Sequence, residues 1–310
     1  MRIMSKIRKA IHYLRHNRVQ FLDSCLLKFG FLFSDRLFLS LRYRLLFGKW
    51  IDWNNPTTYN EKLQWLKIYN RRQEYTNLVD KYEVKKYVEA LVGSDYIIPT
   101  LGIWDKFDDI DFDALPNQFV LKTTNGGGGT GVVICKDKKS FNIDSAKIKI
   151  EKSLKHNLYN ILREWPYKDI TPRIIAEAYI CDDVHPVPID YKFYCFNGQP
   201  QIVAIATERA IKTCFDYYDM SFNHLEFTQG GPNSSKAISK PLSFDKMISL
   251  ASVLSHNLPH VRIDLYEIHE RIYFGEFTFF DSSGFARFNP ENWDFVMGSW
   301  IKLPNPKIDA

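Results

Sequence analysis

The residues with the clearest chemical potential are a lysine and a run of glycines in Phe119-Val-Leu-Lys-Thr-Thr-Asn-Gly-Gly-Gly-Gly-Thr-Gly131. Residues 119–121 predict a short β-strand that delivers Lys122, and the loop behind it holds five of the chain's 15 glycines. A loop without side chains exposes backbone N–H groups that can surround an anion, most often phosphate. Lys122 adds a positive charge beside them. The alternative is a flexible hairpin loop, but the order strand, lysine, loop favours phosphate binding. The loop matches neither the Walker A nor the GxGxxG pattern.

Charged residues also interrupt the apolar, strand-like runs that follow. Glu177 lies within residues 174–180, Lys192 within 191–196, Asp264 within 261–265 and Glu276 within 272–279. Burying such groups without partners costs free energy. We therefore expect each of them to face a partner or a ligand.

Asp264 and Glu276 together predict a metal site. Their two runs flank His269-Glu-Arg271, which predicts a hairpin with the carboxylates opposite each other across the ladder. Two adjacent carboxylates repel unless a cation lies between them, and oxygen ligands completed by phosphate suit Mg²⁺. Arg262 lies on the same face of its strand and could hold a phosphoryl oxygen. The alternative is a solvent-facing sheet with ordinary surface charges.

An α+β arrangement must position these residues. Thr58-Tyr-Asn-Glu61 predicts a capping box at the start of a helix, and Asn197-Gly198 predicts a hairpin turn. Residues 216–231 are expected to form a loop. Helices are predicted over 61–72, 79–91, 145–164 and 244–257, and strands over 119–122, 132–135, 174–180, 191–196, 201–206, 261–265 and 272–279.

Length and composition indicate a globular protein of one large or two ordinary domains, with 310 residues of which 45% are hydrophobic. The five cysteines are scattered and form no CxxC pair, which favours a reducing, cytoplasmic compartment and argues against zinc. No apolar run approaches the length of a membrane span, so we expect neither a transmembrane helix nor a cleavable signal.

Positive charge is concentrated at the N-terminus. The chain has a net charge of +5, yet residues 1–50 hold 11 Lys/Arg and 2 Asp/Glu, or +9, which leaves −4 for the rest. Residues 1–16 form a basic amphipathic helical pattern, and 19–47 continue as apolar helix-like segments. Such helices can lie on an anionic membrane surface, or can pack on the body with a solvated basic face. No nucleic-acid-binding module is visible, so nucleic acid is not expected as a partner.

The order of these motifs resembles the ATP-grasp fold, and more closely its TupA-like branch from bacterial surface-polysaccharide and teichuronopeptide biosynthesis. The resemblance covers roughly residues 50–303. Within it we expect a helical region over 51–118, a glycine-flap subdomain over 119–176 and a second subdomain over 177–303. The basic helical extension over 1–50 and a tail over 304–310 lie outside it. The matching stretches lie at 56–65, 79–85, 98–102, 119–131, 190–198, 261–264 and 275–279.

The resemblance also implies roles for individual residues. Lys81 and Lys122 match the two lysines that reach the nucleotide phosphates, and the glycine loop would close over these phosphates through Gly126, Gly127, Gly128 and Gly129. Glu177, with the main chain at Tyr179 and Ile180, matches the adenine-binding hinge, and Asp183 or Asp190 would hold the ribose. Lys192 and Arg262 match the catalytic cations, whereas Asp264, Glu276 and Thr278 match the metal ligands. Many relatives have Asn in place of Thr278, so one or two Mg²⁺ ions remain alternatives.

The function that the resemblance implies is ATP-dependent ligation of a carboxylate to an amine. A carboxylate attacks the γ-phosphate to give an acylphosphate and ADP, and an amine then displaces phosphate. The implied substrates are a uronic acid of a glycan precursor and an amino acid, in capsule, O-antigen (lipopolysaccharide) or cell-wall polysaccharide synthesis. A glycosyltransferase is one alternative, with Asp109-Ile-Asp111 as its metal motif. A nucleotide-binding pseudoenzyme and a kinase that stops at phosphoryl transfer are the others.

Overall fold

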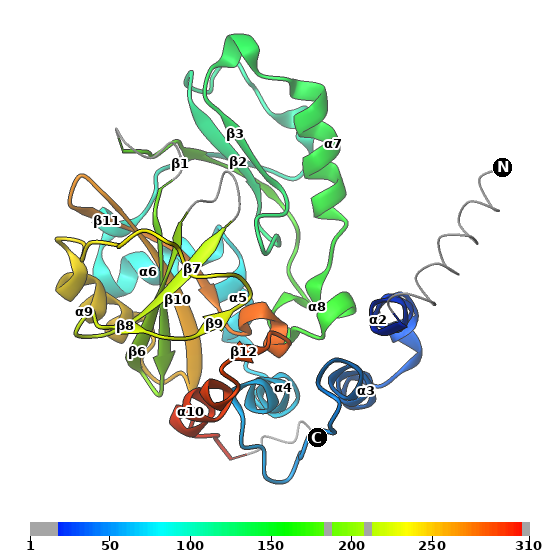
Figure 1. Cartoon of the computed structure of the whole chain (residues 1–310). Coiled ribbons are helices and arrows are strands. Elements are labelled where there is room, and N and C mark those ends of the chain that lie inside the picture. The colour runs from blue at the N-terminus through cyan, green and yellow to red at the C-terminus, as the bar shows by residue number, and fades with distance from the viewer. Residues whose placement is uncertain (1–17, 183–187, 208–212, 306–310) are drawn as a thin grey trace.

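The computed structural model describes residues 18–182, 188–207 and 213–305 and divides them into two sheet-based lobes and a helical extension (Figure 1). The predicted N-terminal helix over 1–16 and the candidate ribose ligand Asp183 lie outside the described residues. The α-helices are α2 (Arg18–Phe29), α3 (Asp35–Phe47), α4 (Tyr59–Tyr69), α5 (Glu74–Val79), α6 (Glu83–Val92), α7 (Ile143–Leu154), α8 (Leu158–Leu162), α9 (Phe244–Leu254) and α10 (Asn292–Trp300).

The strands form antiparallel sheets. They are β1 (Thr100–Trp104), β2 (Phe119–Thr123), β3 (Val132–Cys135), β4 (Ile174–Ala178), β5 (Asp190–Phe196), β6 (Gln199–Thr207), β7 (Cys214–Asp219), β8 (His224–Leu225), β9 (Thr228–Gln229), β10 (His260–Ile268), β11 (Arg271–Thr278) and β12 (Phe288–Asn289). The first sheet has the order β1-β4-β2-β3, the second β11-β10-β5-β6-β7-β8, and β12 pairs with β9. The strong hairpin predictions are therefore confirmed.

The first lobe carries the glycine loop. Its sheet packs against α7 (Figure 1). Its core holds Phe119, Leu121 and Ala176, on the opposite face of the strands from Lys122 and Glu177. The glycine loop joins β2 to β3 and therefore sits at the end of this sheet that faces the second lobe.

The second lobe carries the charged pair of the hairpin β10–β11. Asp264 pairs directly with Glu276, as predicted, and Val261, Ile263 and Leu265 alternate with the charged residues and enter the core. The register shifts between Asp264 and Leu265, so Gly275 is the extra residue of a bulge beside the acid pair. Helix α9 packs against β5, β6 and β10 and covers the face away from these charges.

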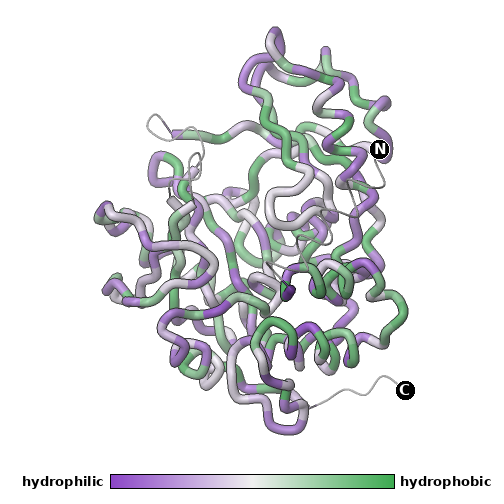
Figure 2. Tube along the Cα trace, turned by 45° about the vertical axis from the view of Figure 1, so that its right-hand side comes forward, coloured by the Kyte–Doolittle hydropathy of each residue, from purple (hydrophilic) through white to green (hydrophobic). Residues whose placement is uncertain are grey.

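The helical extension packs on the body through α3. Phe38, Leu39 and Tyr43 are fully buried, whereas α2 has no buried residue. Along the helices of the chain, hydrophobic and hydrophilic residues are interspersed (Figure 2). For α3, this burial matches the predicted alternative in which a helix of the N-terminal segment packs on the body.

Three of the predicted elements are wrong. The helix over 79–91 is divided because Asp80 accepts hydrogen bonds from the backbone N–H groups of Tyr82 and Glu83, and so starts α6 anew. Asn157 caps α8 in the same way and interrupts the helix over 145–164. Residues 216–231 form most of β7 together with β8 and β9 instead of a loop, because β7 pairs with β6 and buries Tyr217 and Tyr218.

All five cysteines are free thiols. Cys135, Cys195 and Cys214 are buried, whereas Cys25 on α2 and Cys181 after β4 are partly exposed. Burial raises the pKa of Cys195 to about 12, so this thiol behaves as a small hydrophobic side chain.

Candidate active site

A cavity of about 860 Å³ lies between the two lobes and gathers the predicted site residues. Every one of them that the structure describes lines it: Lys81, Lys122, Gly126–Gly129, Glu177, Tyr179, Ile180, Asp190, Lys192, Arg262, Asp264, Glu276 and Thr278. These residues come from segments up to two hundred residues apart in the sequence. Asp109 and Asp111, the motif of the glycosyltransferase alternative, are not among the lining residues.

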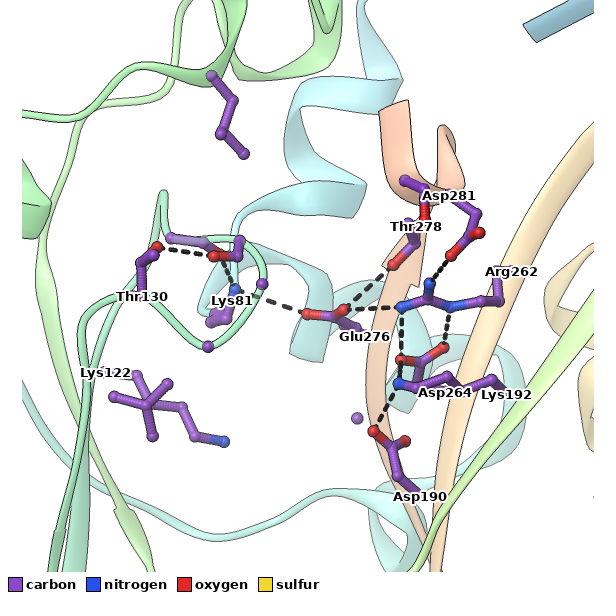
Figure 3. Close-up of a pocket in the computed structure, with 18 of the residues that line it drawn as sticks. Lys81, Lys122, Thr130, Asp190, Lys192, Arg262, Asp264, Glu276, Thr278 and Asp281 are labelled. Carbon is purple, nitrogen blue, oxygen red and sulfur yellow. Dashed lines mark hydrogen bonds and ion pairs between the residues drawn. The ribbon is translucent and has the colours of Figure 1, made fainter. Parts of the chain in front are cut away.

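Lys81 connects the glycine loop to the opposite lobe. It lies in the turn that Asp80 creates between α5 and α6, and its backbone N–H donates to the Thr124 carbonyl at 3.1 Å. Its ammonium donates to the Gly126 carbonyl and lies 3.8 Å from a carboxylate oxygen of Glu276 (Figure 3). Lys81 is thus placed where an anion between the loop and the second lobe would meet a positive charge.

Lys122 shares the carboxylate of Glu177 with a second lysine that the sequence analysis missed. Each oxygen of Glu177 lies 2.5 Å from one ammonium group, Lys122 on β2 and Lys85 on α6. Burial opposes ionisation of Glu177, yet the two lysines hold the pKa of this carboxyl below its usual value. Glu177 therefore positions Lys122 in the described state. The spacing of Lys81 and Lys85, one helical turn apart, could have pointed to the second lysine.

Arg262 organises the carboxylates of the second lobe. Its Nε and Nη2 donate to the two oxygens of Asp264 at 2.7 and 2.8 Å, its Nη2 also reaches Glu276 at 3.4 Å, and its Nη1 donates to Asp281 (Figure 3). This planar fork is the strong, bidentate form of an arginine–carboxylate pair. Asp281, in the 3-10 turn that follows β11, was missed because it lies outside any strand-like run.

Lys192 completes this charge network from β5. Its ammonium lies 2.5 Å from Asp190 and 2.5 Å from Asp264. Burial alone would lower the pKa of Lys192, but the two carboxylates raise it above its usual value. Burial likewise opposes ionisation of Asp264, whereas Arg262 and Lys192 lower its pKa. The network therefore keeps both partners charged.

The acid pair on β10 and β11 offers hard oxygen donors. Asp264 and Glu276 lie opposite each other, and the Thr278 hydroxyl donates to Glu276 at 3.1 Å. Two carboxylates and a hydroxyl on one sheet face fit a magnesium ion that takes its remaining ligands from phosphate and water. Within the described residues, no group of three or more His, Cys, Asp or Glu side chains forms a metal site by itself.

The cavity is also lined by residues outside the predicted nucleotide-binding motifs. Arg42 from α3, Leu162 from α8, Glu164 and the Ser282–Ser283 turn are among them, together with Tyr217 and Gln229 from the second lobe. The extension thus contributes a side chain to the cavity wall.

Two sheet lobes that enclose a cavity, with a glycine loop at its rim and facing lysines, arginine and acid pair, form the arrangement of an ATP-grasp protein. The sequence agrees, because the family described as TupA-like ATPgrasp matches residues 61–302. The chain belongs to this family. A comparison with curated proteins finds no match.

Solved structures of ATP-grasp ligases are similar at low identity. The D-alanine–D-alanine ligase of Helicobacter pylori is 17% identical, with a TM-score of 0.43, over 79% of this chain and 69% of that one. The ATP complex of the Bacillus anthracis enzyme is 15% identical, with a TM-score of 0.39, over 65% and 53%. The L-amino acid ligase of Bacillus licheniformis is 16% identical, with a TM-score of 0.41, over 73% and 50%. The matched part therefore spans about half to two thirds of these chains.

Proposed function

We propose that the protein is an ATP-dependent carboxylate–amine ligase that joins an amino acid to a uronic-acid carboxylate of a glycan precursor in surface-polysaccharide biosynthesis. The observation that carries the proposal is the convergence of the glycine loop, Lys81 and Lys122 with the Arg262 network in one cavity. Family membership supports ATP as the nucleotide. The choice of uronic acid and amino acid rests on the resemblance to the TupA-like branch.

The residues of the cavity divide the reaction between them. Lys81, Lys122 and the backbone N–H groups of Gly126–Gly129 would bind the phosphates, and Glu177 with the main chain at Tyr179 and Ile180 would bind adenine. Asp190 is the ribose ligand that the described residues offer. Asp264, Glu276 and Thr278 would hold Mg²⁺, which neutralises phosphate charge when bound. Arg262 and Lys192 would stabilise the charge of the transferred phosphoryl group.

Ligation then needs positioning more than proton transfer in its first half. The substrate carboxylate attacks the γ-phosphorus, the bond to the β-phosphate oxygen breaks, and ADP leaves with that electron pair. Glu177 lies between Lys122 and Lys85 in the described state. Adenine binding at the hinge would therefore compete with these pairs and would release Lys122 toward the phosphates.

The test is calorimetry of ATP binding with and without Mg²⁺. We expect Lys122→Ala to weaken binding by about 10- to 100-fold, the loss of one or two charge-assisted hydrogen bonds. Glu276→Gln should remove the magnesium dependence. The matched controls are Lys136→Ala, an exposed lysine at the end of the same hairpin, and Glu270→Gln, an exposed turn residue between β10 and β11. Folded wild-type protein that binds no ATP would overturn the proposal.

A screen for ADP release then identifies the substrates. Hexuronic acids and amino acids are supplied in pairs, and we expect ADP only when both members of the correct pair are present or, more slowly, with the carboxylate alone. ATP binding without turnover in any mixture would favour the pseudoenzyme. ADP release with a stable phosphorylated product and no amide would favour the kinase.

We further propose that the enzyme works in the cytoplasm and docks peripherally on the inner membrane through α2 and the turn that follows it. Phe31 and Leu32 are 75% and 66% exposed, and Lys28 and Arg36 are exposed beside them. Exposed apolar side chains with adjacent cations suit an anionic lipid surface. No helix in the described part of the chain is long and apolar enough to span a membrane.

Co-sedimentation with anionic and neutral vesicles tests this docking. We expect Phe31→Ser/Leu32→Ser to lose binding to vesicles that contain phosphatidylglycerol, and Ile148→Ser, which changes a 70% exposed side chain on α7, to retain it. Equal partitioning of all three proteins would contradict the proposal. Deletion of residues 1–50 is unsuitable, because it removes the buried Phe38, Leu39 and Tyr43.

A further inference from the structure

One carboxylate of the cavity has no lysine or arginine nitrogen within 4 Å among the described residues. Among the described lining residues, Glu177, Asp190, Asp264, Glu276 and Asp281 each lie within 4 Å of a lysine or arginine nitrogen. Glu164, which lines the same cavity and is 7% exposed, forms no such pair with any described residue. It is therefore the carboxylate of the cavity that is available to a cation brought by a ligand.

A buried hydrogen-bond chain holds Glu164 in place. Lys67 of α4 has no exposed surface, and its ammonium donates to the Leu162 carbonyl at 3.0 Å, the Ser283 carbonyl at 2.9 Å and the Ser283 hydroxyl at 2.7 Å. Because Lys67 donates to the Ser283 oxygen, the hydroxyl hydrogen is left to donate to the carboxylate of Glu164, its hydrogen-bond partner. The chain thus runs from the core to the cavity wall.

The turn that carries Ser283 has a strained backbone and is held in place by hydrogen bonds from α4. Ser282 and Ser283 have φ values of 48° and 54°, a left-handed backbone conformation that is unfavourable for a residue other than glycine. Gln64 of α4 donates to the carbonyls of Ser283 and Gly284 at 3.0 and 2.8 Å, beside Lys67. Such strain is retained where the surroundings enforce it, and here α4 enforces the position of the Ser283 hydroxyl.

Charged groups on three neighbouring elements act on Glu164, which in turn acts on the buried Tyr167 in the 3-10 turn that follows it. Lys67 of α4, Asp281 of the turn after β11 and Arg262 of β10 act on it electrostatically, and Arg42 of α3 acts on Lys67. Burial raises the pKa of Glu164, and Lys67 and Ser283 oppose that rise without cancelling it. Burial lowers the pKa of Lys67 to about 7. A carboxylate with a raised pKa is a better proton acceptor at neutral pH than an ordinary one.

We propose that Glu164 binds the ammonium group of the amine substrate and takes its proton, and that Ser283 and Lys67 are positioning residues for its carboxylate. This inference rests on the proposed ligase function. The ammonium nitrogen has no lone pair, so one proton must pass to Glu164 before the nitrogen attacks the acylphosphate carbon. The carbon–nitrogen bond then forms, the carbon–oxygen bond to phosphate breaks, and the phosphate leaves with the electron pair and takes the second proton.

A comparison of two nucleophiles tests whether Glu164 removes a proton from the amine substrate. Hydroxylamine is uncharged at neutral pH and needs no base to attack an acylphosphate, whereas an amino acid arrives as an ammonium ion. Wild type, Glu164→Gln and the control Glu151→Gln, an exposed glutamate on α7, are assayed with the carboxylate found by the ADP screen. We expect Glu164→Gln to keep hydroxamate formation within about threefold while amide formation falls by about 10²- to 10⁴-fold.

The outcomes are distinct. Amide formation by Glu164→Gln at the wild-type rate would overturn the inference, and so would an equal loss of hydroxamate and amide, which would indicate a structural role. If wild type itself gives no hydroxamate with any carboxylate, the ligase function fails and the inference falls with it. Calorimetry of ATP binding to Glu164→Gln confirms that the nucleotide site is intact.

The roles of Ser283 and Lys67 are tested by the pH dependence of kcat for amide formation. Ser283→Ala removes a donor to the carboxylate, which should raise the pKa of Glu164 further and move the acidic limb of the kcat profile for amide formation to higher pH. Lys67→Met should move it in the same direction, because it removes a cation. A loss of activity without any shift of this limb would contradict their role in holding Glu164.

Discussion

Every nitrogen of the Arg262 guanidinium donates a hydrogen bond to a carboxylate from β10, β11 or the turn that follows β11. A lysine at this position could reach one of these groups but could not bridge them, because it lacks the rigid planar fork. The like charges of Asp264, Glu276 and Asp281 are therefore held close together before any substrate arrives. Prediction from sequence reached the first two, since alternation along a strand places Arg262 and Asp264 on one face, but not Asp281.

His260 shows how a buried residue near this network sets the acid limit of the fold. Its Nδ1 lies 2.9 Å from the Cys195 carbonyl, which can only accept, so Nδ1 donates and Nε2 accepts from the Tyr59 hydroxyl at 3.0 Å. Burial lowers the pKa of His260 to about 3. The folded protein therefore keeps this imidazole neutral where an unfolded chain protonates it.

This difference predicts a pH dependence of stability. Between about pH 6.5 and pH 3 the unfolded state binds one more proton at His260 than the folded state, so the free energy of unfolding falls as the pH falls. In His260→Gln the slope of this free energy against pH should be smaller by about one proton, roughly 1.4 kcal/mol per pH unit at most. Urea denaturation from pH 7 to pH 4 measures it, and parallel slopes in both proteins would refute the assignment.

At the scale of elements, the glycine loop is shaped by packing at one end and is open at the other. A β-carbon at Gly131 would lie 2.2 Å from the Ser153 Oγ and 2.6 Å from the Thr123 Oγ1, and its φ is +70°. Gly129 has a similar φ of +74°, but nothing lies within 4 Å of its β-carbon position. A side chain at Gly131 would therefore meet both a steric clash and an unfavourable backbone conformation, whereas one at Gly129 would meet only the unfavourable conformation.

We expect Gly131→Ala to displace the loop and to weaken ATP binding by more than tenfold. Gly129→Ala should carry only the left-handed strain of about 1 kcal/mol and weaken binding less than tenfold. Calorimetry on both variants gives the comparison, and thermal denaturation shows whether the body is intact. Equal losses of affinity would mean that the contact with Ser153 is unimportant.

Elements with strong local signals were predictable, whereas the helix breaks at Asp80 and Asn157 were not. The Thr58–Glu61 capping box and the Asn197-Gly198 turn occur as predicted, since their chemistry is local. Asp80 and Asn157 instead divide helices that hydrophobic spacing would continue, because their side chains satisfy backbone donors better than the next helical turn does. The first of these breaks is what brings Lys81 to the glycine loop.

At the scale of the molecule, Asp35 links the helical extension to residues that lie after α4 and on or directly after α8. It accepts from Arg71 at 2.5 Å and from Tyr159 at 3.0 Å, and it pairs with Arg163 at 3.0 Å. The chain outside the family match thereby joins the wall of the cavity. Nothing in the sequence of residues 18–50 revealed this, because each of these contacts spans more than thirty residues.

Asp35→Asn should lower the free energy of unfolding by about 2 kcal/mol, since it leaves two partly buried arginines without their carboxylate. ATP affinity should be unchanged, as the nucleotide motifs lie elsewhere in the cavity. Asp245→Asn, which removes an exposed ion pair with Lys240, is the control and should change stability by less than about 0.5 kcal/mol. Denaturation curves that coincide for Asp35→Asn and wild type would show that the extension is held by apolar packing alone.

The positions of the partly exposed thiols allow nucleotide binding to be followed in the unmodified chain. Cys181 directly follows the segment of Tyr179 and Ile180 that lines the cavity, whereas Cys25 lies on α2, and both are partly exposed. An alkylating reagent should reach these two and spare the buried ones. Bound nucleotide should then slow the labelling of Cys181, whereas the labelling rate of Cys25 should not change and serves as an internal reference. Mass spectrometry of the labelled peptides would therefore footprint occupancy directly, without a single engineered residue and without knowledge of the other substrates.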